Sequence, residues 1–148
     1  MDNRMNLIRF EIPGEPGAKA RPKFSTQGGF VRAITPEKTV NYETLVKLAF
    51  QEQCPGVYFD HDKALGMWVY ARRSTPKSAS KRKTARMVGG DIRPGKKPDY
   101  DNIGKIVSDA LNGIAYKDDA QIVDGRTIKL YSAIPSVVVE IWEEGENG

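Results

Sequence analysis

The chain has 148 residues, of which 39% are hydrophobic and 28% charged, and its formal net charge is +4. This length suits a single domain over residues 1–148, able to bury about 70% of the surface that the unfolded chain exposes. The sequence holds no apolar run of about 18 residues and no secretory signal, and its single cysteine and single histidine exclude a disulfide framework and zinc sites built on Cys or His pairs. We therefore expect a cytoplasmic protein without membrane contact.

The first third of the chain predicts a strand followed by a long helix. Leu7–Ile12 alternates apolar and polar residues, which is typical of a half-buried strand. Gly28–Val31 suggests a short hairpin or strand. Thr35 suits an N-cap and Pro36 the first helical position of a helix that runs to about Gln53. The residues expected to form its apolar face are Val40, Leu45, Leu48, Ala49 and Phe50.

The middle of the chain predicts a strand and two further helices. Ala64–Arg72 is rich in apolar and aromatic residues and reads as a strand. Ser78 or Ser80 suits the N-cap of a short helix that continues through Met87 and ends at the following glycines. Residues 101–112 carry the clearest helical periodicity, and Gly113 is a good stop. The apolar stripe of this helix consists of Ile103, Ile106, Val107, Ala110 and Leu111.

The last part of the chain predicts strands. Ile122–Val123 begins one, and Arg126–Tyr131 and Ser136–Trp142 read as two more, separated by Pro135. Because the last two are close in sequence, we expect them to run antiparallel. The tryptophans Trp68 and Trp142 fall in strands and are expected in the core. The predicted fold is α+β, with a mixed sheet of four to five strands packed against two main helices.

Positive charge is concentrated in one segment. Residues 71–97, here called the basic arm, hold ten Lys or Arg against one acid, a net charge of +9, whereas the rest of the chain is at −5 and ends in a short acidic tail over residues 143–148. Such an arm suits a polyanion such as DNA; the alternative is a solvated loop without a partner. The candidate DNA-binding residues are Lys77, Lys81, Arg82, Lys83, Arg86, Lys96 and Lys97, joined by Lys19, Arg21 and Lys23 from an N-terminal basic loop.

Carboxylates surround the helix that follows the arm. Asp99 and Asp101 form an Asp-x-Asp pair whose side chains can face one cation, and Asp118 and Asp119 offer a third carboxylate. Carboxylates without His or Cys suit Mg²⁺, whose usual substrates are phosphate esters. The alternative is structural: helix-capping acids, turn acids, and an ion pair between Asp101 and Lys105, four residues apart.

The same stretch carries a family resemblance. Residues 97–124 read KPDYDNIGKIVSDALNGIAYKDDAQIVD, which resembles the core motif of the RusA family of phage and prophage Holliday-junction resolvases. Weaker likenesses extend over most of the chain. The resemblance implies that Asp99, Asp101 and Asp119 are the catalytic, metal-binding carboxylates, that Asp118 is an adjacent acid that assists, and that Lys105 is the functional lysine of the site.

The resemblance also implies an activity. The family consists of homodimers that resolve four-way DNA junctions in recombination and repair by paired nicks, leaving 5′-phosphates, with Mg²⁺ as the cofactor and Mn²⁺ as its substitute. Two alternatives stay open: a nuclease of the same fold that acts on other branched or single-stranded DNA, and a DNA-binding protein without catalysis. Some relatives have a histidine before the motif, where this chain has Gly89–Ile92.

Overall fold

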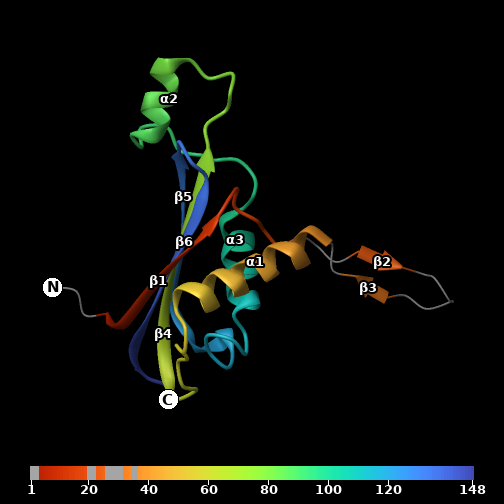
Figure 1. The fold of residues 1–148 in the computed structure, drawn as a ribbon, viewed down its shortest axis with the longest axis vertical. Helices are drawn as coiled ribbons and strands as arrows, with labels where there is room; N and C mark the ends of the chain where they lie inside the picture. The colour runs from red at the N-terminus through yellow and green to blue at the C-terminus, as the bar shows by residue number, and fades with distance from the viewer. Residues whose placement is uncertain (1–3, 20–22, 26–31, 35–36) are drawn as a thin grey trace.

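A four-stranded mixed sheet forms the centre of the computed structural model, which describes residues 4–19, 23–25, 32–34 and 37–148. The strand order is β1-β6-β4-β5, with β4 and β5 parallel and the other neighbouring pairs antiparallel (Figure 1). This confirms the predicted α+β class. The strands are β1 (Met5–Pro13), β4 (Lys63–Ser74), β5 (Ile122–Ser132) and β6 (Ser136–Glu146).

Two helices, α1 and α3, lie on one face of this sheet, while α2 stands at one end of it (Figure 1). Two short strands, β2 and β3, pair with each other in a separate ribbon. No helix in the described residues is long and apolar enough to cross a membrane. The remaining elements are β2 (Lys23–Ser25), β3 (Arg32–Ile34), α1 (Glu37–Gln53), α2 (Lys81–Val88), α3 (Tyr100–Ala110) and the 3-10 turn η2 (Asp119–Gln121).

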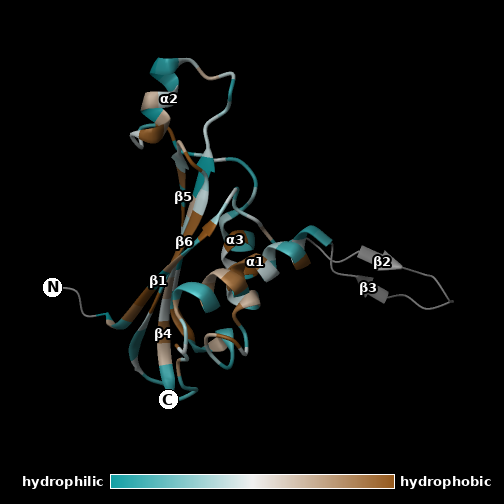
Figure 2. Cartoon of the chain, in the orientation of Figure 1, coloured by the Kyte–Doolittle hydropathy of each residue, from teal (hydrophilic) through white to brown (hydrophobic). Residues whose placement is uncertain are grey.

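The core lies between the sheet and the helices α1 and α3. Alternate residues of the strands face it, and in Figure 2 the hydrophobic colour recurs along the strands. Phe10 of β1 meets Phe50 of α1 edge to face, with ring centroids 5.5 Å apart. Ile106 and Val107 of α3 are fully buried, as the predicted stripe requires. Each such side chain contributes about 1.5–3 kcal/mol to folding.

The predicted apolar face of α1 is wrong in part. The residues that face the core are Thr39, Tyr42, Val46, Ala49 and Phe50, whereas Val40, Leu45 and Leu48 are about half exposed. The reason is a close approach of the N-terminal loop. The Tyr42 ring lies directly against Gly17, where an added Cβ would sit 2.4 Å from it, so this contact fixes the rotation of α1 about its axis. Gly28–Val31 and the predicted cap Thr35–Pro36 lie outside the described residues.

The last two strands run in opposite directions, as predicted, but they are not neighbours. β4 lies between β5 and β6, parallel to the first and antiparallel to the second. The three residues 133–135 that join them cross the end of β4, a distance of two strand spacings, roughly 10 Å, which a chain of this length spans. Placing β5 at this edge brings the turn η2, which precedes it, beside α3.

Candidate active site

The N-terminus of α3 presents two acids to solvent. Asp99 is the N-cap residue with extended backbone (φ −70°, ψ 148°), yet its carboxylate makes no capping hydrogen bond, so the capping role suggested for this side chain is not used. Asp101 lies in the first turn, and both side chains are exposed. They line a common pocket of about 420 Å³ together with Lys96 and Lys129. The expectation that Asp99 and Asp101 face the same space agrees with this geometry.

A second pocket, of about 310 Å³, joins Asp101 to Asp119. Its walls include Gly104 and Ser108, which follow Asp101 along one face of α3, and residues from β5. Tyr100 and Asp101 line both pockets, so the two depressions meet at the start of α3. Asp99, Asp101 and Asp119 therefore lie in that order along one surface, which we call the acid groove.

The turn η2 holds Asp119 at the far end of this groove. The Asp119 amide donates to Oδ1 of Asn112 at 2.8 Å, just beyond the end of α3. The carboxylate of the preceding residue, Asp118, accepts from the Ala120 amide at 2.9 Å and forms a capping box with Gln121. The Asp118 carboxylate thus caps the backbone of the turn, while the Asp119 side chain lines the pocket and contacts Asp109 of α3.

The carboxylates of Asp118 and Asp109 make the surroundings of the Asp119 carboxylate more negative. Burial raises the pKa of Asp119, and hydrogen bonding and charge from Asp118 and Asp109 raise it further. The hydrogen bond from the Ala120 amide lowers the pKa of Asp118. The groove therefore ends in a half-buried acid whose negative charge has carboxylate neighbours and no cation among its described contacts.

The three carboxylates are spread along the groove. Asp109, which hydrogen-bonds Asp119, lies eight residues after Asp101, or roughly 12 Å along the helix. In keeping with this spacing, the described residues contain no group of three or more Asp, Glu, His or Cys side chains placed so that it could hold a metal ion. The assignment of Asp99, Asp101 and Asp119 as joint metal ligands, with Asp118 as helper, stays a prediction.

Lys105 is exposed one turn after Asp101. No ion pair joins these two side chains among those that the described residues form, so the structural alternative for them is not realised here. Both charges are free for other contacts, and the catalytic role predicted for Lys105 stays a prediction.

Lys19, a predicted DNA contact, has other partners. Its ammonium lies 2.8 Å from Oε1 of Glu43 in α1 and 3.4 Å from Oδ2 of Asp109 in α3. The hydrogen bond to Glu43 raises the pKa of Lys19. Lys19 therefore ties two helices together beside the acid groove. Arg21 lies outside the described residues, and of Lys23 only the backbone, in β2, is described.

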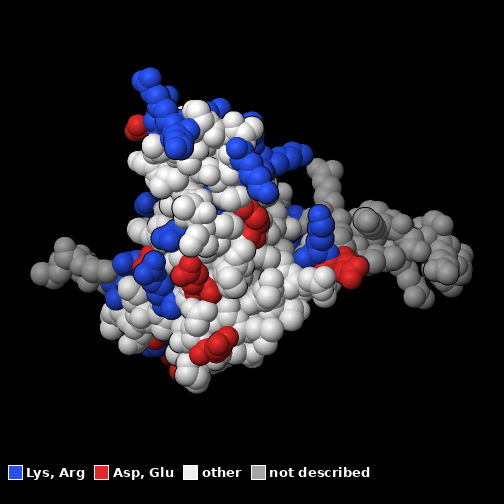
Figure 3. Space-filling view, turned by 45° about the horizontal axis from the view of Figure 1, so that its top comes forward, with Lys and Arg blue, Asp and Glu red and all other residues white. Residues whose placement is uncertain are grey.

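The helix α2, which carries four of the cations of the basic arm, lies at one end of the molecule (Figure 1). Lys81, Arg82, Lys83 and Arg86 are exposed on α2, and blue side chains gather at this end in Figure 3. Ser80 caps α2, accepting from the Lys83 amide at 3.1 Å, as one of the two predicted alternatives required. The remaining candidates of the arm, which are also exposed, are Lys77, Lys96 and Lys97.

Sequence reasoning missed two residues of this surface. Lys129 of β5 lines the Asp99–Asp101 pocket, and Tyr100 is 65% exposed between the two pockets. A lysine in a strand and a tyrosine between two aspartates carry little signal without a fold. Trp142 is buried, as expected of a core residue, whereas Trp68 is only half-buried beneath Arg4 and Arg126.

Comparison with known proteins decides the family. The sequence model of endodeoxyribonuclease RusA matches residues 13–142. This chain belongs to the RusA endodeoxyribonuclease family. The match covers both pockets, the basic arm, the whole of β4 and β5, most of β6 and the last residue of β1, and it confirms the resemblance drawn from residues 97–124. This RusA-family chain is also 39% identical over 141 residues to an uncharacterized protein, YqaN, of Bacillus subtilis (strain 168), which covers 94% of this chain and 98% of the relative.

Proposed function

We propose that this RusA-family protein is a Mg²⁺-dependent endodeoxyribonuclease that resolves four-way DNA junctions in recombination and repair. The observation that carries the proposal is the acid groove, in which Asp101 lines one pocket with Asp99 and the next with Asp119. The exposed basic arm at the end of the same molecule supplies the surface that holds DNA. The reaction is hydrolysis that leaves 5′-phosphate and 3′-hydroxyl ends.

The donor set of the groove fits Mg²⁺, with Mn²⁺ as a substitute. All three side chains offer carboxylate oxygens, and the half-buried Asp119 lies among other acids, where a bound cation offsets their repulsion. When bound, Mg²⁺ activates a water and neutralises charge on the phosphate. Asp99, Asp101 and Asp119 would hold the ion, since their carboxylates line the two adjoining pockets.

The chain's own residues divide the remaining work. Asp118 fixes the turn that carries Asp119, because its carboxylate caps the backbone of η2. Lys105, exposed and without an ion pair to Asp101, offsets the charge that develops on the phosphate. The exposed lysines and arginines of the arm contact phosphates without reading sequence.

Resolution of a junction requires two cuts in opposed strands. We infer a homodimer whose two-fold axis places one groove on each of these strands. The protein acts in the cytoplasm, where its DNA substrates lie.

The test is cleavage of a synthetic four-way junction by the full chain in Mg²⁺. We expect paired symmetric nicks, which EDTA abolishes. Asp101→Asn keeps the shape of the side chain but removes a charge shared by both pockets, so we expect cleavage to fall at least about 100-fold, the scale of loss for a group that acts on the transition state. Junction affinity, measured by gel shift, changes less than about threefold, since phosphate contacts lie elsewhere.

Two outcomes contradict this proposal. Cleavage of flapped or single-stranded DNA with the four-way junction left intact, measured on a substrate panel at one salt concentration, would favour another nuclease of the family. Binding without cleavage of any substrate, together with a melting temperature that Mg²⁺ does not raise, would favour a non-catalytic DNA-binding protein.

A further inference from the structure

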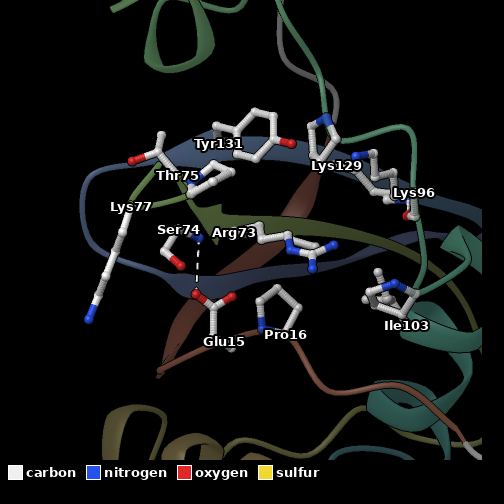
Figure 4. A pocket seen from close by; sticks show the side chains of 14 residues that line it. Glu15, Pro16, Arg73, Ser74, Thr75, Lys77, Lys96, Ile103, Lys129 and Tyr131 are labelled. Atoms are coloured by element: carbon white, nitrogen blue, oxygen red, sulfur yellow. Dashed lines mark hydrogen bonds between the residues drawn. The ribbon is translucent and has the colours of Figure 1, made fainter. Parts of the chain in front are cut away.

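A third and larger cavity adjoins the acid groove and has no place in the function proposed so far. It has a volume of about 570 Å³ and lies where β4 and β5 end, between Pro16 of the N-terminal loop and the segment 94–98 (Figure 4). Four cations line it, namely Arg73, Lys77, Lys96 and Lys129, against one acid, Glu15. Oε1 of that acid accepts a hydrogen bond from the Ser74 amide at 3.1 Å. The cavity is therefore suited to an anion.

The walls of this cavity are held in place by hydrogen bonds. Arg73 donates from Nη1 to the Lys97 carbonyl at 2.6 Å, and the Lys129 ammonium donates to the Lys96 carbonyl. Arg93 donates from Nε to the Lys129 carbonyl at 3.0 Å. These contacts fasten the segment before α3 onto the ends of β4 and β5, and each guanidinium or ammonium keeps further N–H donors for a ligand.

The apolar part of the cavity suits a flat organic group. The half-buried Tyr131 and four prolines line it along with the cations. In Figure 4 the Tyr131 ring and the Arg73 side chain project from the strands into the space between Lys77 at one end and Lys96 and Lys129 at the other. A volume of this size accepts a small organic ligand and exceeds what one phosphate fills. A phosphate carrying a sugar and a base matches both the charge and the apolar surface.

The cavity continues into the acid groove. Lys96 and Lys129 line both this cavity and the pocket of Asp99 and Asp101. Three depressions thus follow one another over the surface, from the cations at the end of β4, past Asp99 and Asp101, to Asp119. If a DNA strand is cut beside Asp99 and Asp101, a nucleotide next to the cut lies beside Lys96 and Lys129.

We propose that this cavity binds one unpaired nucleotide next to the cut, with its phosphate against the cations and its base stacked on Tyr131. The proposal rests on the proposed function for the identity of its ligand, a DNA strand, and adds a site that selects among strands. Removing a base from a duplex costs a few kcal/mol and costs least where pairing is already interrupted. The cavity therefore favours cutting at branch points over cutting in continuous duplex.

The test measures binding in EDTA, so that cleavage plays no part. A single abasic residue is moved through the positions around the junction centre, and the affinity of the wild-type chain is measured for each substrate. We expect one position near the cut to lose affinity about tenfold, as for one stacked base. With Tyr131→Ile, intact junction binds about tenfold more weakly, and the abasic residue at that position costs nothing further. Tyr131→Phe, which keeps the ring, keeps the wild-type pattern.

Several results would overturn the proposal. One is that no position of the abasic residue lowers the affinity for the junction. Another is that the abasic residue lowers this affinity equally in the wild type and in Tyr131→Ile. A second measurement needs no variant: 5-iodouracil at the sensitive position should cross-link to Tyr131 on irradiation, and cross-linking to another residue contradicts the site. If the protein cleaves the junction but the effect of the abasic residue does not depend on Tyr131, the nucleotide site in the cavity is wrong and the nuclease function stands. If that effect depends on Tyr131 but the protein does not cleave in Mg²⁺, the nuclease function is wrong and the nucleotide site stands. A complete lack of DNA binding rejects both.

Discussion

Two adjacent aspartates differ in role because of what their side chains contact. Asp118 holds the turn, where it accepts from the Ala120 amide and pairs with Gln121 in a capping box, and it also hydrogen-bonds the Asp119 carboxyl group. Asp119 has its amide held by Asn112, and its carboxylate lines the pocket that Asp101 also lines. In sequence the two residues are equivalent members of an Asp-Asp pair, and only the fold separates the capping acid from the acid of the groove.

The difference predicts opposite results for two isosteric substitutions. Asp119→Asn should lower Mg²⁺-dependent junction cleavage at least about 100-fold, because it removes a charge from the groove. Asp118→Asn should change cleavage less than about threefold, because asparagine caps as well as aspartate does. Both variants are assayed on the same junction under single-turnover conditions. Equal losses in the two variants would assign the pair one shared role and contradict the division described here.

Lys19 illustrates how an ionic residue near a site can act on stability. Its ammonium joins Glu43 of α1 to Asp109 of α3, and these two side chains are only about one quarter exposed or less. We expect Lys19→Met to lower the free energy of unfolding by about 1 kcal/mol, the upper end for such pairs. That corresponds to a fall in Tm of about 2–4 °C. The salt dependence of DNA binding should not change.

The control for this prediction is Lys38→Met, an exposed lysine of α1 outside the described ion pairs. It should leave Tm within about 1 °C, as expected for a surface change. If Lys19→Met instead keeps its Tm and reduces the salt dependence of DNA binding, Lys19 is a phosphate contact, as the sequence alone suggested.

At the scale of elements, local patterns predicted what local forces determine. The bounds of α3 were predicted within two residues at each end, because its apolar stripe and terminal glycine lie close together in the sequence. The rotation of α1 about its axis was not predicted, because it depends on Gly17, twenty-five residues before Tyr42. The pairing of β5 with β4 and the position of Asp119 beside α3 likewise arise from contacts between distant segments. The sequence thus indicated the acids that line the groove but not their spacing along it.

The packing of β4 against β6 offers a test of how tightly the sheet is built. Gly66 pairs with Trp142, and a Cβ added there would lie 2.2 Å from the indole ring. The indole is held edge to face against Trp68, with centroids 5.3 Å apart, and its Nε1 donates to Glu144 at 2.6 Å. Displacing it should cost about 1–3 kcal/mol. We therefore expect Gly66→Ala to lower Tm by at least about 2–4 °C.

Gly125→Ala is the matched control in the neighbouring strand β5. A Cβ at Gly125 meets its nearest neighbour, Ile122, at 3.6 Å, an ordinary contact. This variant should keep or slightly raise Tm, since alanine restricts the unfolded chain more than glycine does. Similar thermal shifts for the two variants, in a calorimetric or circular dichroism melt, would show that the indole moves aside at little cost.

At the scale of the whole molecule, the acids of the groove and the cations of α2 lie apart in space. The acids lie beside α3 and η2, against the body of the fold, whereas α2 stands at the end of the sheet and contacts β5 (Figure 1). The larger cavity lies between these regions, with cations from both the arm and β5. This order along the surface suits a strand that is held at one end and cut at the other.

The arm can therefore be weakened without touching the acids. Lys81, Arg82 and Lys83 are exposed, and their side chains make no ion pair within the described residues. Replacing all three by Gln keeps helix-forming residues in α2, so the fold should persist.

Each phosphate that the variant no longer neutralises lowers the slope of log affinity against log salt concentration by about one unit. We expect the slope to fall by about two to three units, because three side chains can neutralise at most about three phosphates. The cleavage rate at saturating protein should stay within about threefold of wild type, because the acids are untouched. Binding is measured by fluorescence anisotropy on one junction between roughly 50 and 200 mM salt, the range over which phosphate binding dominates the salt dependence. An unchanged slope would make α2 a solvated helix and leave the cavity and the groove as the whole DNA-binding surface.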